Sequence, residues 1–167
     1  MAAVLAPVED ALARAFPAAA RIEKKTLYLD VDRAARIERE AGSELPSRIV
    51  TCYEARGDGD GGDPLLGWAC LDTHVVRTLP ETVLVVVGPD LRVRRVEVLA
   101  FKEPRDYLPS DRWLAQFDGV PLDDDTALKR RIRVLSGATL SSRAITRAVR
   151  RVLAVVELEL AGQGADR

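Results

Sequence analysis

The sequence contains very few of the residue types that most protein metal centres require. Its 167 residues include one histidine and two cysteines, whereas a structural zinc site normally takes four Cys or His ligands. We therefore expect no metal site. His74 is the only imidazole of the chain, so any imidazole chemistry would have to pass through this residue.

Three further absences disfavour whole classes of protein. No apolar run approaches the roughly 18 residues that a membrane-spanning helix needs. The chain has 25 Lys and Arg against 26 Asp and Glu, a formal net charge of -1, whereas nucleic-acid-binding domains are expected to be strongly basic. No Gly-x-Gly-x-x-Gly follows a predicted strand, so a nicotinamide-dependent reductase lacks its fingerprint. We expect no nucleic-acid partner and no membrane span in this chain.

What the sequence does contain is typical of one globular domain. Hydrophobic residues make up 47% and charged residues 31% of the chain, and this length is sufficient for a single core. Alternating and continuous apolar runs predict an antiparallel β-sheet with hairpins at about 47–72 and 81–100, packed with helices. The predicted fold is therefore α+β. Residues 1–64 would supply the N-terminal helices and first strands, 65–160 the core of the same domain, and 161–167 a disordered tail.

The two cysteines flank a loop rich in glycine and aspartate, residues 57–63. If the first hairpin is centred near Gly61, Cys52 and Cys70 lie directly opposite each other, and a cross-strand disulfide is possible. Two free buried thiols fit the sequence equally well, because free cysteine is among the most buried residues. The sequence leaves both alternatives open.

The most distinctive segment is Ser136-Gly137-Ala138-Thr139-Leu140-Ser141-Ser142, which precedes a helical pattern from Arg143 to Leu160. A helix N-terminus offers free N–H groups and the positive end of the helix dipole, so it attracts anions. No Asp or Glu lies between Asp125 and Glu157, while basic residues stand on both sides of the segment. A bound phosphate would suit this charge pattern. An ordinary hydroxyl N-cap followed by a solvated arginine-rich face would also produce it.

This segment resembles the signature of the FMN-binding domain family. The family includes the flavin-carrying C subunit of the sodium-pumping NADH:quinone reductase and the G subunit of the Rnf electron-transport complex. The resemblance extends upstream over roughly residues 65–156. Gly67-Trp68-Ala69 is similar to the family's Gly-Tyr-Gly segment, Val83 to Leu99 to its paired strands, and Lys102-Glu103-Pro104 to the start of its flavin loop.

The resemblance implies an FMN cofactor and an electron-transfer function. In the family, the last Thr of the Ser-Gly-Ala-Thr motif carries FMN through a phosphoester bond that a separate flavin transferase installs; here that residue would be Thr139. The implied partners are the flavin transferase and redox proteins, and the chain would be an electron carrier or a subunit of a redox complex, with no catalytic residue of its own. The implied cofactor-binding residues are Ser136, Gly137, Ala138, Thr139, Leu140, Ser141, Ser142, Glu103 and His74.

The sequence departs from the family pattern at two places. Arg133 stands where the family usually has Asp, three residues before the first Ser of the motif, and Pro104-Arg105-Asp106-Tyr107 replaces the Thr-Pro-Gly-Leu-Gly that follows Glu in the family. The alternative interpretation is a non-redox binding module on the same fold, which holds a phosphorylated ligand or a protein partner without covalent flavin. The family resemblance implies an extracytoplasmic location, periplasmic or membrane-associated, if a signal has been removed; otherwise the protein would be cytoplasmic.

Overall fold

The computed structural model describes residues 3–123, 132–133 and 139–162. It contains one six-stranded sheet with the order β1-β6-β5-β4-β3-β2, and every neighbouring pair is antiparallel. The predicted α+β fold is confirmed, and the predicted hairpins correspond to β3–β4 and β5–β6. The strands are β1 (Ala3–Val4), β2 (Arg21–Tyr28), β3 (Ile49–Arg56), β4 (Leu65–Val76), β5 (Leu79–Val87) and β6 (Val93–Phe101).

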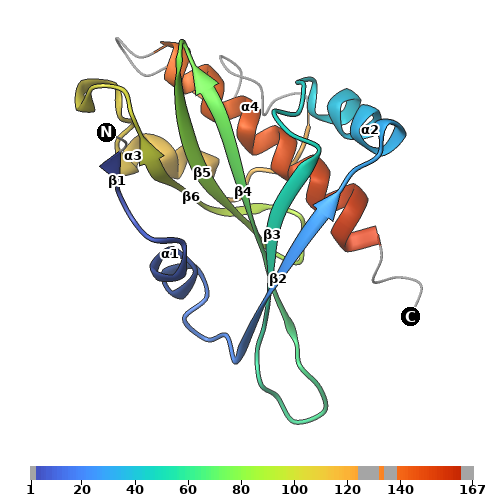
Figure 1. Ribbon diagram of the computed structural model, residues 1–167. Coiled ribbons are helices and arrows are strands. Elements are labelled where there is room, and N and C mark those ends of the chain that lie inside the picture. The colour runs from blue at the N-terminus through green and yellow to red at the C-terminus, as the bar shows by residue number, and fades with distance from the viewer. Residues whose placement is uncertain (1–2, 124–131, 134–138, 163–167) are drawn as a thin grey trace.

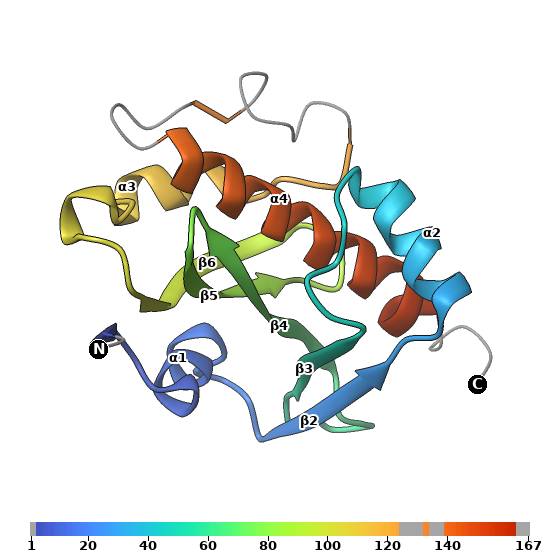
Figure 2. The same cartoon turned by 45° about the horizontal axis from the view of Figure 1, so that its top comes forward.

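Helices cover both faces of this sheet. α2 and α4 lie together on one face and α1 lies on the other, as the two ribbon views show (Figures 1 and 2). α4 is long and crosses behind β4 and β5, so its first turn lies near the β4–β5 tip. The helical segments are α1 (Val8–Ala15), α2 (Val31–Ala41), η1 (Arg105–Tyr107), α3 (Asp111–Leu114), η2 (Ala115–Phe117), α4 (Thr139–Val155) and its π-helical continuation η4 (Val156–Ala161).

The continuous apolar run of β5 is explained by its central position in the sheet. Val83, Val85 and Val87 face the core beneath α2 and α4, while Leu84 and Val86 face the smaller core beneath α1. Because both faces of this strand are covered, neither set of alternate positions needs to be polar. The pairing of β5 with β6 skips Arg94, so β6 has a bulge where two arginines interrupt its alternation of apolar residues.

The β3–β4 hairpin has the register that the cysteine spacing predicts. Cys52 and Cys70 are cross-strand partners, with Cα atoms 4.1 Å apart, and they form a disulfide in the fully buried part of the hairpin. Of the two alternatives left open by the sequence, the structure therefore has the disulfide.

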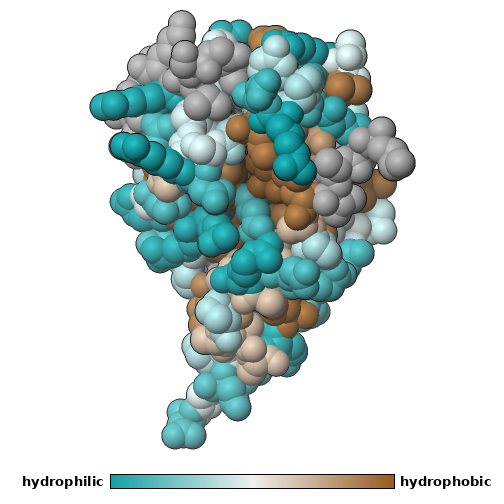
Figure 3. All heavy atoms as spheres, turned by 90° about the vertical axis from the view of Figure 1, so that its left-hand side faces the viewer, coloured by the Kyte–Doolittle hydropathy of each residue, from teal (hydrophilic) through white to brown (hydrophobic). Residues whose placement is uncertain are grey.

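Seen from the side, the tip of the β3–β4 hairpin forms a narrow hydrophilic lower end, whereas the upper half of that side carries a hollowed hydrophobic area (Figure 3).

Side-chain caps begin α2 and α3, whereas α4 begins earlier than its sequence pattern predicts. Asp30 caps α2 by accepting a hydrogen bond from the Arg33 N–H, and Ser110 caps α3 in the same way with Trp113. α4 begins at Thr139, four residues earlier than the apolar pattern predicts. The three hydroxyl residues Thr139, Ser141 and Ser142 thus lie in its first turn, where Ser and Thr are well tolerated. The proposed boundaries at 64 and 160 remain predictions, and most of the predicted tail lies outside the described residues.

Candidate functional site

The first turn of α4 presents one exposed hydroxyl group. Thr139 and Leu140 are exposed, whereas Ser141 and Ser142 are buried. Ser136, Gly137 and Ala138 lie outside the described residues. The first turn contains no acidic side chain, and Arg143 follows on the exposed side one turn later. The described part of the motif is therefore a positively polarised helix end with an accessible hydroxyl, which suits a phosphate group.

The two buried serines have a different environment. Ser142 is fully buried, and its carbonyl accepts a 2.8 Å hydrogen bond from Oγ1 of Thr146, itself buried in α4. Ser141 is also on the buried side of the helix. The predicted binding roles of these two serines stay predictions, but both residues are buried whereas Thr139 is exposed.

The chain just before the motif is anchored on α3 and η2. The indole Nε1 of Trp113 donates a 2.7 Å hydrogen bond to the Arg133 carbonyl, and the Arg133 N–H donates a 2.9 Å hydrogen bond to Oε1 of Gln116. Ile132 beside it is buried in the main core, and Trp113 packs edge-to-face on Phe117. These contacts fix the Arg133 backbone, while its side chain is exposed.

The predicted flavin loop lies between β6 and α3. Glu103 is half-buried there and, in the described part of the chain, makes no hydrogen bond or ion pair. Tyr107 in the same loop lies under the guanidinium group of Arg77, 4.9 Å from the ring centroid. Since Arg77 belongs to the β4–β5 turn, this contact ties the loop to the tip of that hairpin. No hydrogen bond or ion pair among the described residues joins Glu103 to Thr139.

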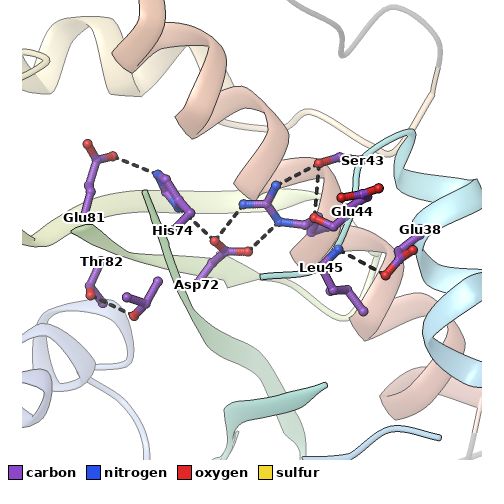
Figure 4. A network of polar contacts seen from close by, with 10 residues as sticks. Glu38, Ser43, Glu44, Leu45, Asp72, His74, Glu81 and Thr82 are labelled. Carbon is purple, nitrogen blue, oxygen red and sulfur yellow. Dashed lines mark hydrogen bonds and ion pairs between the residues drawn. The ribbon is translucent and has the colours of Figure 1, made fainter. Parts of the chain in front are cut away.

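His74 lies in a buried polar network that the sequence analysis did not detect. Its Nδ1 is 2.9 Å from Oδ1 of Asp72 on the same strand, and its Nε2 is 3.3 Å from Oε1 of Glu81 on β5 (Figure 4). Arg151 of α4 donates two hydrogen bonds to the Asp72 carboxylate, at 2.8 and 2.9 Å, and a third to Oγ of Ser43. The network could have been inferred from the sequence only by pairing β4 with β5 in the correct register, which places His74 directly opposite Glu81.

The network shifts the ionisation of two of its members. Burial alone would raise the pKa of Asp72, but the hydrogen bonds from Arg151 and His74 outweigh burial and hold the pKa below its ordinary value. Burial alone would lower the pKa of His74, but the carboxylates of Asp72 and Glu81 reverse this effect and raise the pKa above the usual value. The structure therefore favours an ionised Asp72 next to a protonated imidazole.

An open pocket of about 440 Å³ connects this network with the α4 surface. Ala144 contributes to its wall, five residues after Thr139, which corresponds to about 7.5 Å along a helix axis. The pocket thus lies along α4 from the exposed hydroxyl of the first turn. Its lining residues are Gly42, Ser43, Glu44, His74, Val75, Ala144, Arg147 and Arg151.

Residues 79–154 match the family model of the FMN-binding domain. This segment is similar to the FMN-binding domain. The matched segment runs from β5 into α4 and includes Glu103 and the motif at 136–142, whereas His74 lies just before it. The match indicates FMN as the cofactor and confirms the family resemblance. No curated protein matches the chain.

The described residues of the matched segment fit a phosphate-bearing cofactor. The positive end of the α4 dipole, the hydroxyl of Thr139 and the guanidinium of Arg143 would hold the phosphate of FMN. No helix in the described ranges is both long and apolar enough to cross a membrane. The search of those ranges also finds no group of three or more His, Cys, Asp or Glu arranged to hold a metal ion.

Proposed function

We propose that this protein is an electron carrier whose FMN is attached through its phosphate to Thr139. The observation that carries the proposal is the exposure of Thr139 at the first position of α4, within the matched FMN-binding domain. Another protein can reach this hydroxyl, whereas Ser141 and Ser142 are buried. Among the described hydroxyl groups of the motif, Thr139 is therefore the one suited to modification.

A separate flavin transferase would carry out the attachment. Among the described residues, the first α4 turn provides no carboxylate that could take the Thr139 proton. The histidine is engaged by Asp72 and Glu81 and is buried, so it does not serve as this base either. The chain would be the substrate of the transferase, and its own contribution would be the phosphate-binding helix end.

Bound FMN supplies one- and two-electron redox chemistry, and the protein supplies position and electrostatics. A covalently attached cofactor cannot dissociate between successive partners, which suits a relay between redox proteins. The Cys52–Cys70 disulfide supports an extracytoplasmic location for this relay, because disulfides persist mainly in oxidising compartments. The proposed partners are thus a flavin transferase and redox proteins outside the cytoplasm.

Intact-mass analysis under denaturing conditions tests the attachment. The protein should be co-produced with a flavin transferase and its flavin donor, and the wild type should gain the mass of one FMN residue. Thr139→Ala should lose this gain, while Thr26→Ala, at an exposed position on β2, should keep it. Modification of Thr139→Ala would refute the assignment. Colourless, unmodified wild-type protein would favour the non-redox binding module instead.

Arg133 offers a second test, because the family usually has Asp at this position. The Arg133 backbone is held by Trp113 and Gln116 while its side chain is exposed, so Arg133→Asp should leave the fold intact. If the transferase recognises an acidic group there, Arg133→Asp should raise the modified fraction in a time course of intact mass. An unchanged or lower fraction would show that this position does not limit attachment.

A further inference from the structure

The exposed face of α4 carries positive charge and no acidic side chain. The exposed residues of this helix are Thr139, Leu140, Arg143 and Arg147. The first acidic residue along the helix and its continuation is Glu157 in η4. Because residues four apart on a helix are neighbours, Thr139, Arg143 and Arg147 form one stripe. The exposed hydroxyl therefore lies at the end of a row of two guanidinium groups.

These two arginines differ from the other two arginines of α4. Arg150 donates hydrogen bonds to two backbone carbonyl groups, and Arg151 is bound to the carboxylate of Asp72. Arg143 and Arg147 make no hydrogen bond or ion pair with any described residue. The described contacts that hold α4 to the rest of the domain therefore do not involve these two exposed guanidinium groups.

Exposed apolar side chains adjoin the basic stripe. Leu140 is 45% exposed, and Val75 on β4 is 62% exposed. Val75 lines the same open pocket as Ala144 and Arg147, so β4 and α4 form one continuous surface there. Glu44, between α2 and β3, is the acidic residue that lines this pocket. Arginine is enriched and Asp and Glu are depleted in the cores of protein–protein interfaces, and the composition of this face of α4 agrees with that pattern.

A protein that modifies Thr139 has to cover this surface. An interface of standard size buries about 800 Å² on each partner and so extends roughly 15 Å from its centre. Arg143 and Arg147 follow Thr139 by four and eight residues, about 6 and 12 Å along the helix axis. Both arginines therefore lie under such a partner, where carboxylates of opposite charge would complement them.

We propose that the exposed face of α4, together with Val75, docks the flavin transferase through an acidic surface of that enzyme. The proposal rests on the proposed attachment of FMN at Thr139. The transferase is the partner whose point of action is fixed by the structure, because it must reach the Thr139 hydroxyl itself. Complementary charges at such a surface accelerate the encounter and are screened by salt. The role of Arg147 is thus to attract the transferase.

Attachment kinetics with the purified flavin transferase of the same organism test this docking surface. In Arg147→Glu, the KM for the protein substrate should rise about tenfold, because an attraction becomes a repulsion. The kcat and the KM for the flavin donor should keep their wild-type values. Arg36→Glu is the matched control, because Arg36 is exposed on α2 and the first turn of α2 is bound to η4 at the far end of α4 (Figure 2). Its KM should equal that of the wild type.

The salt dependence of the KM provides a second readout of opposite sign in the two proteins. Raising the ionic strength from about 50 to about 500 mM should raise the wild-type KM, since it screens an attraction, and should lower that of Arg147→Glu, since it screens a repulsion. A KM of Arg147→Glu equal to that of the wild type, or a rise that Arg36→Glu shares, would overturn the docking surface. A lower kcat with an unchanged KM would overturn it as well, because Arg147 would then act on the bound flavin donor.

Binding measurements on Thr139→Ala separate this proposal from the proposed function. This variant cannot accept FMN at residue 139, so calorimetric titration with the transferase reports docking alone. Adding Arg147→Glu to Thr139→Ala should weaken the complex about tenfold. If the wild type is not modified while this weakening is found, the attachment is refuted and the docking surface stands. If the wild type is modified while binding is insensitive to Arg147→Glu, the docking surface is refuted and the attachment stands. Absence of both modification and binding would refute both.

Discussion

The Arg151–Asp72 pair provides the sharpest test of the buried network. Arg151→Met removes three hydrogen bonds, two to the Asp72 carboxylate and one to Ser43, and leaves a buried carboxylate without its strongest partner. Both side chains are about 6% exposed. Breaking such a buried pair from one side typically costs about 3–5 kcal/mol of unfolding free energy. For a protein of this size, that loss lowers Tm by roughly 10 °C.

The same reasoning predicts strong non-additivity. In the double variant Asp72→Asn with Arg151→Met, no buried charge of this pair remains, so the double variant should be more stable than Arg151→Met alone. Urea unfolding of the wild type, both single variants and the double variant completes the cycle. An Arg151→Met cost below about 1 kcal/mol, or strictly additive effects, would refute the assignment of this pair as a tightly coupled buried ion pair.

Two further predictions concern stability. The raised pKa of His74 contributes stability that is complete below about pH 6.5 and is lost as pH rises through the folded-state pKa. The lowered pKa of Asp72 contributes stability that is complete above about pH 3.8 and is lost as pH falls through the folded-state pKa. Tm should therefore be highest between these limits, and His74→Gln should flatten the alkaline decline; an unchanged alkaline decline would contradict the assignment. Replacing both Cys52 and Cys70 by Ala should cost about 3 kcal/mol in urea unfolding, because the disulfide closes a loop of 18 residues. No loss would show that the bridge does not restrain the unfolded chain.

The sequence was most informative where local patterns correspond directly to packing. The continuous apolar run at 83–87 predicts a strand, which the structure has with both faces buried. The cysteine spacing predicts the register of the β3–β4 hairpin. The network around His74 could not be predicted in the same way, because it depends on the β4–β5 register. That turn places Arg77 at φ 57°, a conformation usually marked by Gly or Asn, so the sequence carries no turn signal there.

The helix α4 is the physical link between the two parts of the site. Thr139 lies at its exposed first position and Arg151 twelve residues later, about 18 Å along the axis, in the bidentate pair with Asp72. A helix end that must bind an anion needs a fixed direction, and the buried ion pair restrains α4 against β4. The apolar contacts of α4 with the sheet could slide, whereas a bidentate pair admits one geometry. Loss of Arg151 should therefore lower the yield of FMN attachment at Thr139 in the folded fraction, while Thr139→Ala should leave stability unchanged. If attachment in folded Arg151→Met equals that of the wild type, the apolar contacts of α4 alone hold the helix end in place.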